Sequence, residues 1–163
     1  MLNKERIKRL NMIEDDYERA LLLVSELFED IKDKEKKPYI NHLIRVSIKL
    51  NNKDTKVAGL LHDTLEDTKV TENDLKKLSF SKETIEIVKL VTNKKNQKYH
   101  DKITSILESN NIEAIKLKYS DMQDNYNPER MKDLNILQRN RLKNKYEKEI
   151  KRLEEYLDKI KER

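Results

Sequence analysis

Apolar residues recur at intervals of three and four along most of the chain, which is the spacing of amphipathic helices. The first stretch predicts one helix marked by Leu10, Ile13, Tyr17, Ala20, Leu21, Val24, Leu27, Phe28 and Ile31. A charged loop over residues 33–37 follows it. Further helices are predicted over residues 40–50, 55–65, 98–107, 112–125 and 137–161, with two short ones opening at Thr71 and Ser81. Since no stretch reads as a strand, we expect an all-α fold of about seven helices.

Local signals refine these boundaries. Gly59 lies inside a predicted helix, where glycine costs about 1 kcal/mol relative to alanine, so we expect a neighbouring helix to pack closely against it. Asp54 is the predicted N-cap of that helix. Thr71 and Asp74 resemble a capping box with Asp in the Glu position. One glycine and two prolines leave few tight turns, which argues against an all-β fold.

Charged residues make up 41% of the chain, with both signs interleaved and a net charge of +5. Because apolar residues recur throughout, this composition favours a helical protein with solvated faces over a disordered one. Because lysine is in excess, one hypothesis is that the last helix binds nucleic acid. Acids interleaved in that helix argue against it and favour a packing helix: Glu147, Glu149, Glu154 and Glu155. A modest positive charge also attracts an anionic small substrate.

What the chain lacks excludes several classes of protein. It has no cysteine, so neither disulfides nor thiolate metal ligands are possible. No apolar run approaches the roughly 20 residues of a membrane span. The first residues also lack the apolar core of a signal peptide. We therefore expect a single cytoplasmic domain over residues 1–163. The sequence gives no indication of the oligomeric state.

The strongest chemical signal is the segment 60–68, Leu-Leu-His-Asp-Thr-Leu-Glu-Asp-Thr. It places His62 and Asp63 next to each other in the most apolar part of the chain. His42 follows Pro-Tyr-Ile-Asn upstream, and Asp121 opens the sequence Asp-Met-Gln-Asp-Asn downstream. Polar groups among apolar ones are costly unless something satisfies them, and a divalent metal would do so. We therefore hypothesise a metal site.

Helical spacing supports this hypothesis. His62 and Glu66 are four positions apart, as are Asp63 and Asp67, so each pair projects from nearly one helix face. Imidazole and carboxylate ligands without thiolate suit Mn, Fe, Zn or Mg. Taken singly, each piece also has an ordinary interpretation, such as a satisfied core histidine or an exposed acidic turn. We interpret the third histidine, His100, as a surface residue.

Together these motifs resemble the HD-domain metal-dependent phosphohydrolases, and more narrowly the RelA/SpoT-type hydrolase branch with its small stand-alone members. The resemblance covers about residues 20–127. The small members of this branch also typically have a basic C-terminal helix, which corresponds here to about residues 137–161. It implies an all-α HD-domain helical bundle. It also implies an enzyme that uses Mn²⁺ to remove the 3′-pyrophosphate of the alarmone (p)ppGpp.

The resemblance assigns roles to residues that match its motifs. The implied metal ligands are His42, His62, Asp63 and Asp121. The implied catalytic pair, which positions and activates the attacking water, is Glu66 and Asp67. Contacts to the substrate are expected from Asn125, and by position from Tyr39, Arg45 and Lys37.

One region departs from the family pattern. Alarmone hydrolases carry a first-helix His and a Gly-Gln-x-Arg-like stretch that hold the guanine base, and residues 25–32 lack all four. The following loop lacks the usual glycine but offers Lys34, Lys36 and Lys37 as point charges for distal phosphates, or as a solvated loop. The metal centre is therefore expected to be complete and base recognition rebuilt.

Three functions follow as alternatives. The first is (p)ppGpp pyrophosphohydrolysis. The second is hydrolysis of another phosphorylated nucleotide, such as NADPH, which the missing base contacts favour. The third is non-catalytic nucleotide binding, against which the intact Glu66–Asp67 pair argues.

Overall fold

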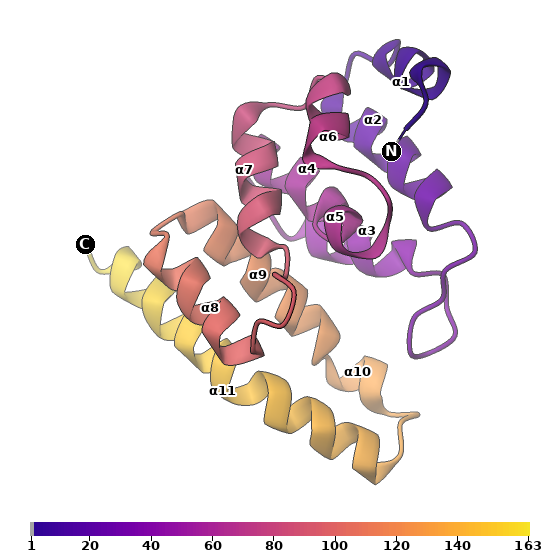
Figure 1. Ribbon diagram of the computed structural model, residues 1–163. Coiled ribbons are helices and arrows are strands. Elements are labelled where there is room, and N and C mark those ends of the chain that lie inside the picture. The colour runs from indigo at the N-terminus through magenta and orange to yellow at the C-terminus, as the bar shows by residue number, and fades with distance from the viewer. Residues whose placement is uncertain (1) are drawn as a thin grey trace.

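In the computed structural model, which describes residues 2–163, all regular structure is helical (Figure 1). In this range the only β-type pairing is an isolated bridge between Lys32 and Pro38, and the all-α prediction is confirmed. The predicted number of about seven helices is too low, because the described residues form eleven, several of them short. The helices are α1 (Lys4–Asn11), α2 (Asp16–Leu27), α3 (Ile40–Ile48), α4 (Lys53–Leu61), α5 (Thr64–Asp67), α6 (Glu72–Lys77), α7 (Lys82–Val91), α8 (Tyr99–Glu108), α9 (Ile112–Asn125), α10 (Pro128–Met131) and α11 (Ile136–Lys161). None of these helices is both long and apolar enough to cross a membrane.

The predicted long first helix is wrong, because it divides into α1 and α2. Asp15 caps α2 by accepting a hydrogen bond from the Glu18 amide at 2.9 Å. The apolar spacing continues through the break because both helices face the same core. The spacing therefore showed which residues are buried, but not that they belong to one unbroken helix. The predicted helix over 55–65 is likewise interrupted, between α4 and α5.

Of the two predicted helix caps, one is correct and the other is wrong. The capping box of Thr71 and Asp74 is present at α6. Asp54, however, is not the N-cap of α4, because Asn52 accepts the hydrogen bond from the Thr55 amide at 3.2 Å. Asp54 instead accepts a hydrogen bond from the Ser81 hydroxyl at 2.7 Å. It thereby joins the first turn of α4 to the start of α7.

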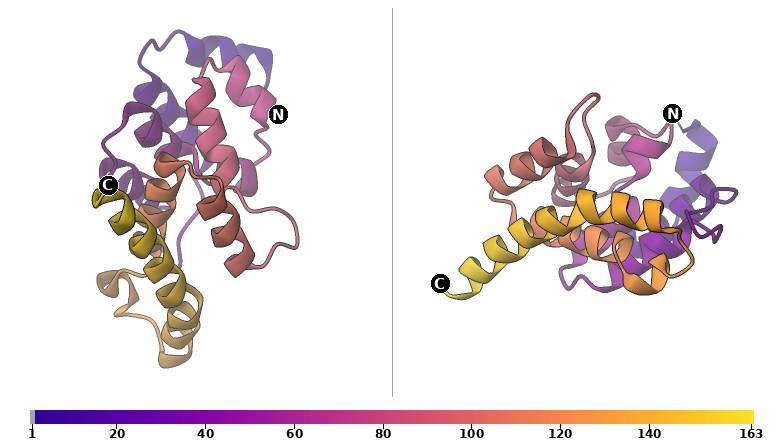
Figure 2. Two further views of the ribbon diagram at one scale, coloured as in Figure 1. Left: turned by 90° about the vertical axis from the view of Figure 1, so that its left-hand side faces the viewer. Right: turned by 90° about the horizontal axis from the view of Figure 1, so that it is seen from below.

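Helix α4 lies at the centre of the molecule and contacts α2, α3, α7 and α9 (Figure 1). Its residues Val57, Ala58, Leu60 and Leu61 are at most 1% exposed. The long α11 packs on α8 and α9 through Tyr146 and Leu153, and Figure 2 shows it running along one side of the molecule. This arrangement directs the C-terminal end of α4 toward α3 and α9, the helices that carry the other motif residues.

Gly59 is the close-approach position of α4. A Cβ atom there would lie 2.9 Å from the Ser47 Cα atom of α3 and 3.1 Å from the Leu50 side chain. We expect Gly59→Ala to lower the free energy of unfolding by about 1–3 kcal/mol, because overpacking outweighs the gain in helix propensity. Urea denaturation measures this. The control, Asn140→Ala on the exposed part of α11, should not be destabilised, and a Gly59→Ala protein as stable as wild type would contradict the expectation.

Candidate metal centre

The four predicted ligands converge on one buried site from three parts of the fold. His42 comes from α3, His62 and Asp63 from the junction of α4 and α5, and Asp121 from α9. The Nε2 atom of His42 lies 3.1 Å from Asp121 Oδ1, and that of His62 lies 3.1 Å from Asp63 Oδ2 and 3.4 Å from Asp121 Oδ1. Ligand atoms bound at about 2.0–2.2 Å to one metal lie roughly 3.0–3.5 Å apart. These three separations match a shared metal ion, and the 3.9 Å between His42 Nε2 and Asp63 Oδ2 stays below twice the ligand distance.

The break between α4 and α5 explains how two adjacent residues face the same site. His62 ends α4, and Asp63 follows with φ −97° and ψ 0°, outside both helices. The His62 Nδ1 atom lies 2.6 Å from the Gly59 carbonyl oxygen, one of the carbonyls that a helix end leaves without a partner. In a continuous helix, neighbours point about 100° apart, whereas here His62 Nε2 and Asp63 Oδ2 lie 3.1 Å from each other.

Hydrogen bonding fixes which imidazole nitrogens face the centre. A carbonyl oxygen only accepts, so His62 Nδ1 must donate to Gly59, and in the neutral ring Nε2 holds the lone pair. The Nδ1 atom of His42 likewise meets Asp124 Oδ2 at 2.7 Å. Both Nε2 atoms are buried, lack a hydrogen-bond partner and face carboxylate oxygens. Only a cation, either a proton or a metal ion, satisfies such an arrangement of acceptors, and these residues fit a divalent metal.

The surrounding charges favour positive charge on both rings. Burial lowers the pKa of His62, but the charges of Asp63 and Asp121 raise it by more, to well above its usual value. Burial also lowers the pKa of His42, but the carboxylates of Asp121 and Asp124 beside its two ring nitrogens outweigh that effect and raise it. A metal ion binding here would therefore displace protons.

Metal affinity should consequently depend on pH. Because protons compete with a metal ion for the two Nε2 atoms and the pKa of both rings is raised, we expect affinity for Mn²⁺ to fall as the pH is lowered from about 8 to about 6. Calorimetric titration in buffers with different heats of ionisation measures the released protons. Affinity that stays constant over this range, with no proton release, would contradict the assignment.

Glu66 and Asp67 lie on α5, one turn beyond His62, and both are exposed to solvent. Partial desolvation and the charges of Asp63 and Glu66 raise the pKa of Asp67 to about 6. A carboxylate with a pKa close to the operating pH is suited to accept a proton from water. The pair is therefore placed at the open side of the centre with suitable chemistry.

The residues predicted to contact substrate lie in different surroundings. Tyr39 donates a hydrogen bond to Asp63 Oδ2 at 2.6 Å, and Asn125 donates one to Asp121 Oδ1 at 2.9 Å. Arg45 bonds to both carboxylate oxygens of Asp124 at 2.8 and 3.2 Å. These three side chains hold carboxylates of the centre. Lys37 stands apart, exposed on the loop before α3. The four predicted contacts are Tyr39, Arg45, Lys37 and Asn125.

Sequence reasoning missed several charged residues around the centre. Lys118 donates to Asp121 Oδ2 at 2.8 Å, and the two are three positions apart on α9, a spacing that the sequence offered. Burial raises the pKa of Asp121, but the charges of Lys118 and His62 hold it well below its usual range. Asp124 is 1% exposed and bonds to His42, and Arg130 in turn bonds to Asp124. No local pattern marked Arg130.

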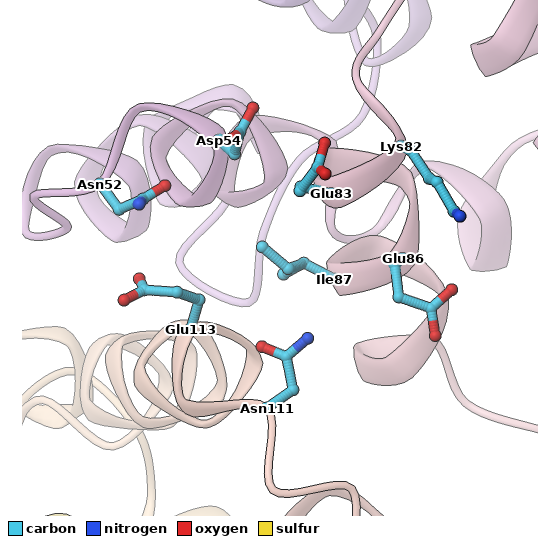
Figure 3. A pocket seen from close by; sticks show the side chains of 8 residues that line it. All are labelled: Asn52, Asp54, Lys82, Glu83, Glu86, Ile87, Asn111 and Glu113. Carbon is cyan, nitrogen blue, oxygen red and sulfur yellow. The ribbon is translucent and has the colours of Figure 1, made fainter.

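A separate pocket lies at the other end of α4, between the starts of α4, α7 and α9 (Figure 3). It has a volume of about 330 Å³ and is rich in carboxylates, including Asp54 and Glu113. Two of its acids have partners within the fold, since Ser81 bonds to Asp54 and Thr55 bonds to Glu113. It is therefore distinct from the His62 site, and its lining residues are Asn52, Asp54, Lys82, Glu83, Glu86, Ile87, Asn111 and Glu113.

Residues 17–160 match the HD domain, so the chain belongs to the HD-domain family and the predicted family is confirmed. Its curated relatives are named guanosine-3′,5′-bis(diphosphate) 3′-pyrophosphohydrolases. It is 36% identical to the protein of Borreliella burgdorferi over 115 residues, which cover 64% of this chain and 17% of the relative. It is 44% identical to MESH1 of Xenopus tropicalis over 70 residues, 39% of this chain and 38% of the relative.

The chain thus spans less than half the length of these curated relatives. A solved structure of a metazoan orthologue of SpoT, which hydrolyses ppGpp and plays a role in starvation responses, matches with a TM-score of 0.65. That match covers 90% of this chain and 96% of the other at 21% sequence identity, which establishes the shared fold.

Proposed function

We propose that this protein is an Mn²⁺-dependent phosphohydrolase that removes the 3′-pyrophosphate of (p)ppGpp. The observation that carries the proposal is the pair of buried Nε2 atoms of His42 and His62, which lack hydrogen-bond partners and face carboxylate oxygens. The names of the curated relatives support the substrate. Mixed imidazole and carboxylate ligands support Mn²⁺. Since the proposed substrate is a cytoplasmic nucleotide, we infer that the protein acts in the cytoplasm.

The reaction divides among the chain's own residues. A divalent cation held by the four ligand residues would polarise a phosphoryl oxygen and lower the pKa of bound water. Asp67, with Glu66 beside it, accepts the proton of the attacking water. The new bond joins the water oxygen to phosphorus, and the bond from phosphorus to the ribose 3′-oxygen breaks. That oxygen takes a proton from solvent, and Asp67 returns its proton to solvent. Tyr39 and Asn125 keep Asp63 and Asp121 oriented.

One observation favours a second candidate, hydrolysis of another nucleotide such as NADPH. Glu26 lies in the stretch where the family's guanine contacts are expected. Its carboxylate pairs with Arg6 at 2.8 Å and Arg9 at 2.7 Å, which joins α1 to α2. This part of α2 therefore has a structural role, and the base must be recognised by other residues.

A nucleotide panel tests both candidates. The protein is incubated with ppGpp, pppGpp or NADPH together with Mn²⁺, Mg²⁺ or Zn²⁺, and released phosphate and pyrophosphate are measured. We expect pyrophosphate from ppGpp with Mn²⁺, and none from a His62→Ala variant. Phosphate from NADPH without pyrophosphate from ppGpp would favour the second candidate. No release from any nucleotide by protein with bound metal would indicate a nucleotide-binding protein without catalysis.

A further inference from the structure

Arg130 on α10 is a buried arginine that contacts carboxylates from two distant segments. Its Nη1 atom lies 2.7 Å from Asp124 Oδ2, its Nε atom 2.8 Å from Glu35 Oε2, and its Nη2 atom 3.0 Å from Asp33 Oδ2. The arginine is 7% exposed, and the three acidic side chains are at most 10% exposed. A planar guanidinium with several donors suits such a junction, whereas an ammonium group is a point charge without this fork of donors.

One side of this junction is the metal centre. The same carboxylate of Asp124 that accepts from Arg130 lies 2.7 Å from His42 Nδ1. It thereby fixes the orientation of the ring that directs Nε2 toward Asp121. Partners of this kind set the tautomer and the basicity of a metal-binding histidine, and their loss typically weakens metal binding 10–100-fold. Arg130, together with Arg45, therefore orients the carboxylate that orients His42.

The other side is the loop over residues 32–38. Asp33 Oδ1 accepts hydrogen bonds from the amides of Glu35 and Lys37 at 2.8 and 3.0 Å, which shapes the loop from within. Lys34 donates to the Asn125 carbonyl oxygen at 2.7 Å. The loop leads directly into Tyr39, whose hydroxyl bonds to Asp63. The loop is thus held both by its own hydrogen bonds and by bonds to residues that contact the metal centre.

We infer that Arg130 is a positioning residue that couples the conformation of the 32–38 loop to the orientation of His42 through the Asp124 carboxylate. This inference rests on the proposed metal-binding role of His42. Coupling between two sites is reciprocal, so metal binding orders the loop to the extent that an ordered loop favours metal binding. Ligands that engage Lys34 or Lys37 would therefore act on the metal centre without touching it.

Four variants of the full chain test the coupling. Arg130→Gln removes the junction, Arg130→Lys keeps one positive charge, and Glu35→Gln removes only a loop anchor. The control, Arg19→Gln, removes an arginine that is 4% exposed and pairs with Asp16 away from the centre. Mn²⁺ affinity is measured by calorimetry. Hydrogen exchange follows the amides of residues 33 and 35–37, which are hydrogen-bonded within the loop.

We expect Arg130→Gln to weaken Mn²⁺ binding about tenfold, the low end of the range for loss of a histidine's direct partner, because Arg45 still bonds to Asp124. Exchange in the loop should increase about tenfold. Glu35→Gln should increase loop exchange and weaken Mn²⁺ binding by a smaller factor. Arg130→Lys should not restore the loop, and Arg19→Gln should match wild type in both measurements. Added Mn²⁺ should slow loop exchange in wild type and leave it unchanged in Arg130→Gln.

Arg130→Gln with wild-type Mn²⁺ affinity and loop exchange would overturn the inference. If that variant does not fold, Glu35→Gln decides: unchanged loop exchange overturns the coupling, and increased exchange with weaker Mn²⁺ binding supports it. If wild type itself binds no Mn²⁺, the proposed function fails, and the nitrogen resonances of His42 decide the inference separately. Shifted resonances in Glu35→Gln then support the coupling, and unchanged ones overturn it.

Discussion

Replacing Glu66 by Gln or Asp67 by Asn is expected to lower kcat by about 10²–10⁴-fold while the protein still binds metal, because general base catalysis typically contributes that much. Neither side chain is among the four groups that surround the Nε2 atoms, and both are exposed on α5. Turnover of the substrate identified in the nucleotide panel and calorimetric titration with Mn²⁺ provide the two measurements.

Asp158→Asn, at an exposed aspartate on α11, is the matched control for loss of one surface carboxylate. It should keep the wild-type rate. Near-wild-type turnover by both the Glu66 and the Asp67 variants would reject their catalytic assignment. Loss of Mn²⁺ binding in either variant would instead place that carboxylate among the ligands.

His62→Ala should abolish the metal dependence of stability. A ligand that binds only the folded state stabilises it by about 2.7 kcal/mol at a hundredfold excess over Kd. A chelator should therefore lower the Tm of wild type and leave that of His62→Ala unchanged. His100→Ala is the control, since His100 is half exposed and bonds to Glu149 on α11. Wild type and His62→Ala that respond alike to the chelator would show that this is not a metal site.

The fold could be predicted well where end signals accompany the apolar pattern. The predicted helix over 112–125 has the observed bounds of α9, and in the structure Asn111 caps its start and Asn127-Pro128 follows its end. The break before α2 could not be predicted, because Asp15 occupies a position that a continuous helix would also expose. Its role as a cap appears only when the chain turns there to pack α1 against α2.

The convergence of the two histidines and two aspartates could be predicted from the order of motifs, and their roles stay predictions. The groups that hold them could not. Asp124 was part of the downstream motif, but nothing local shows that it meets His42, which is carried by a different helix. Arg130 meets Glu35 across 95 positions of sequence. Contacts between residues so far apart in sequence depend on how the helices pack. The spacing of apolar residues along one sequence does not reveal them.

The order in which the ligand groups occur along the chain has a consequence for biosynthesis. His42, His62 and Asp63 precede α5, whereas Asp121 lies far downstream on α9. Chains emerge from the ribosome with the N-terminal part first. A nascent chain therefore exposes three of the four groups well before α9 has been made, and α9 must dock before the set is complete. If these four groups bind the metal as proposed, loading of the complete site is accordingly a late event in maturation.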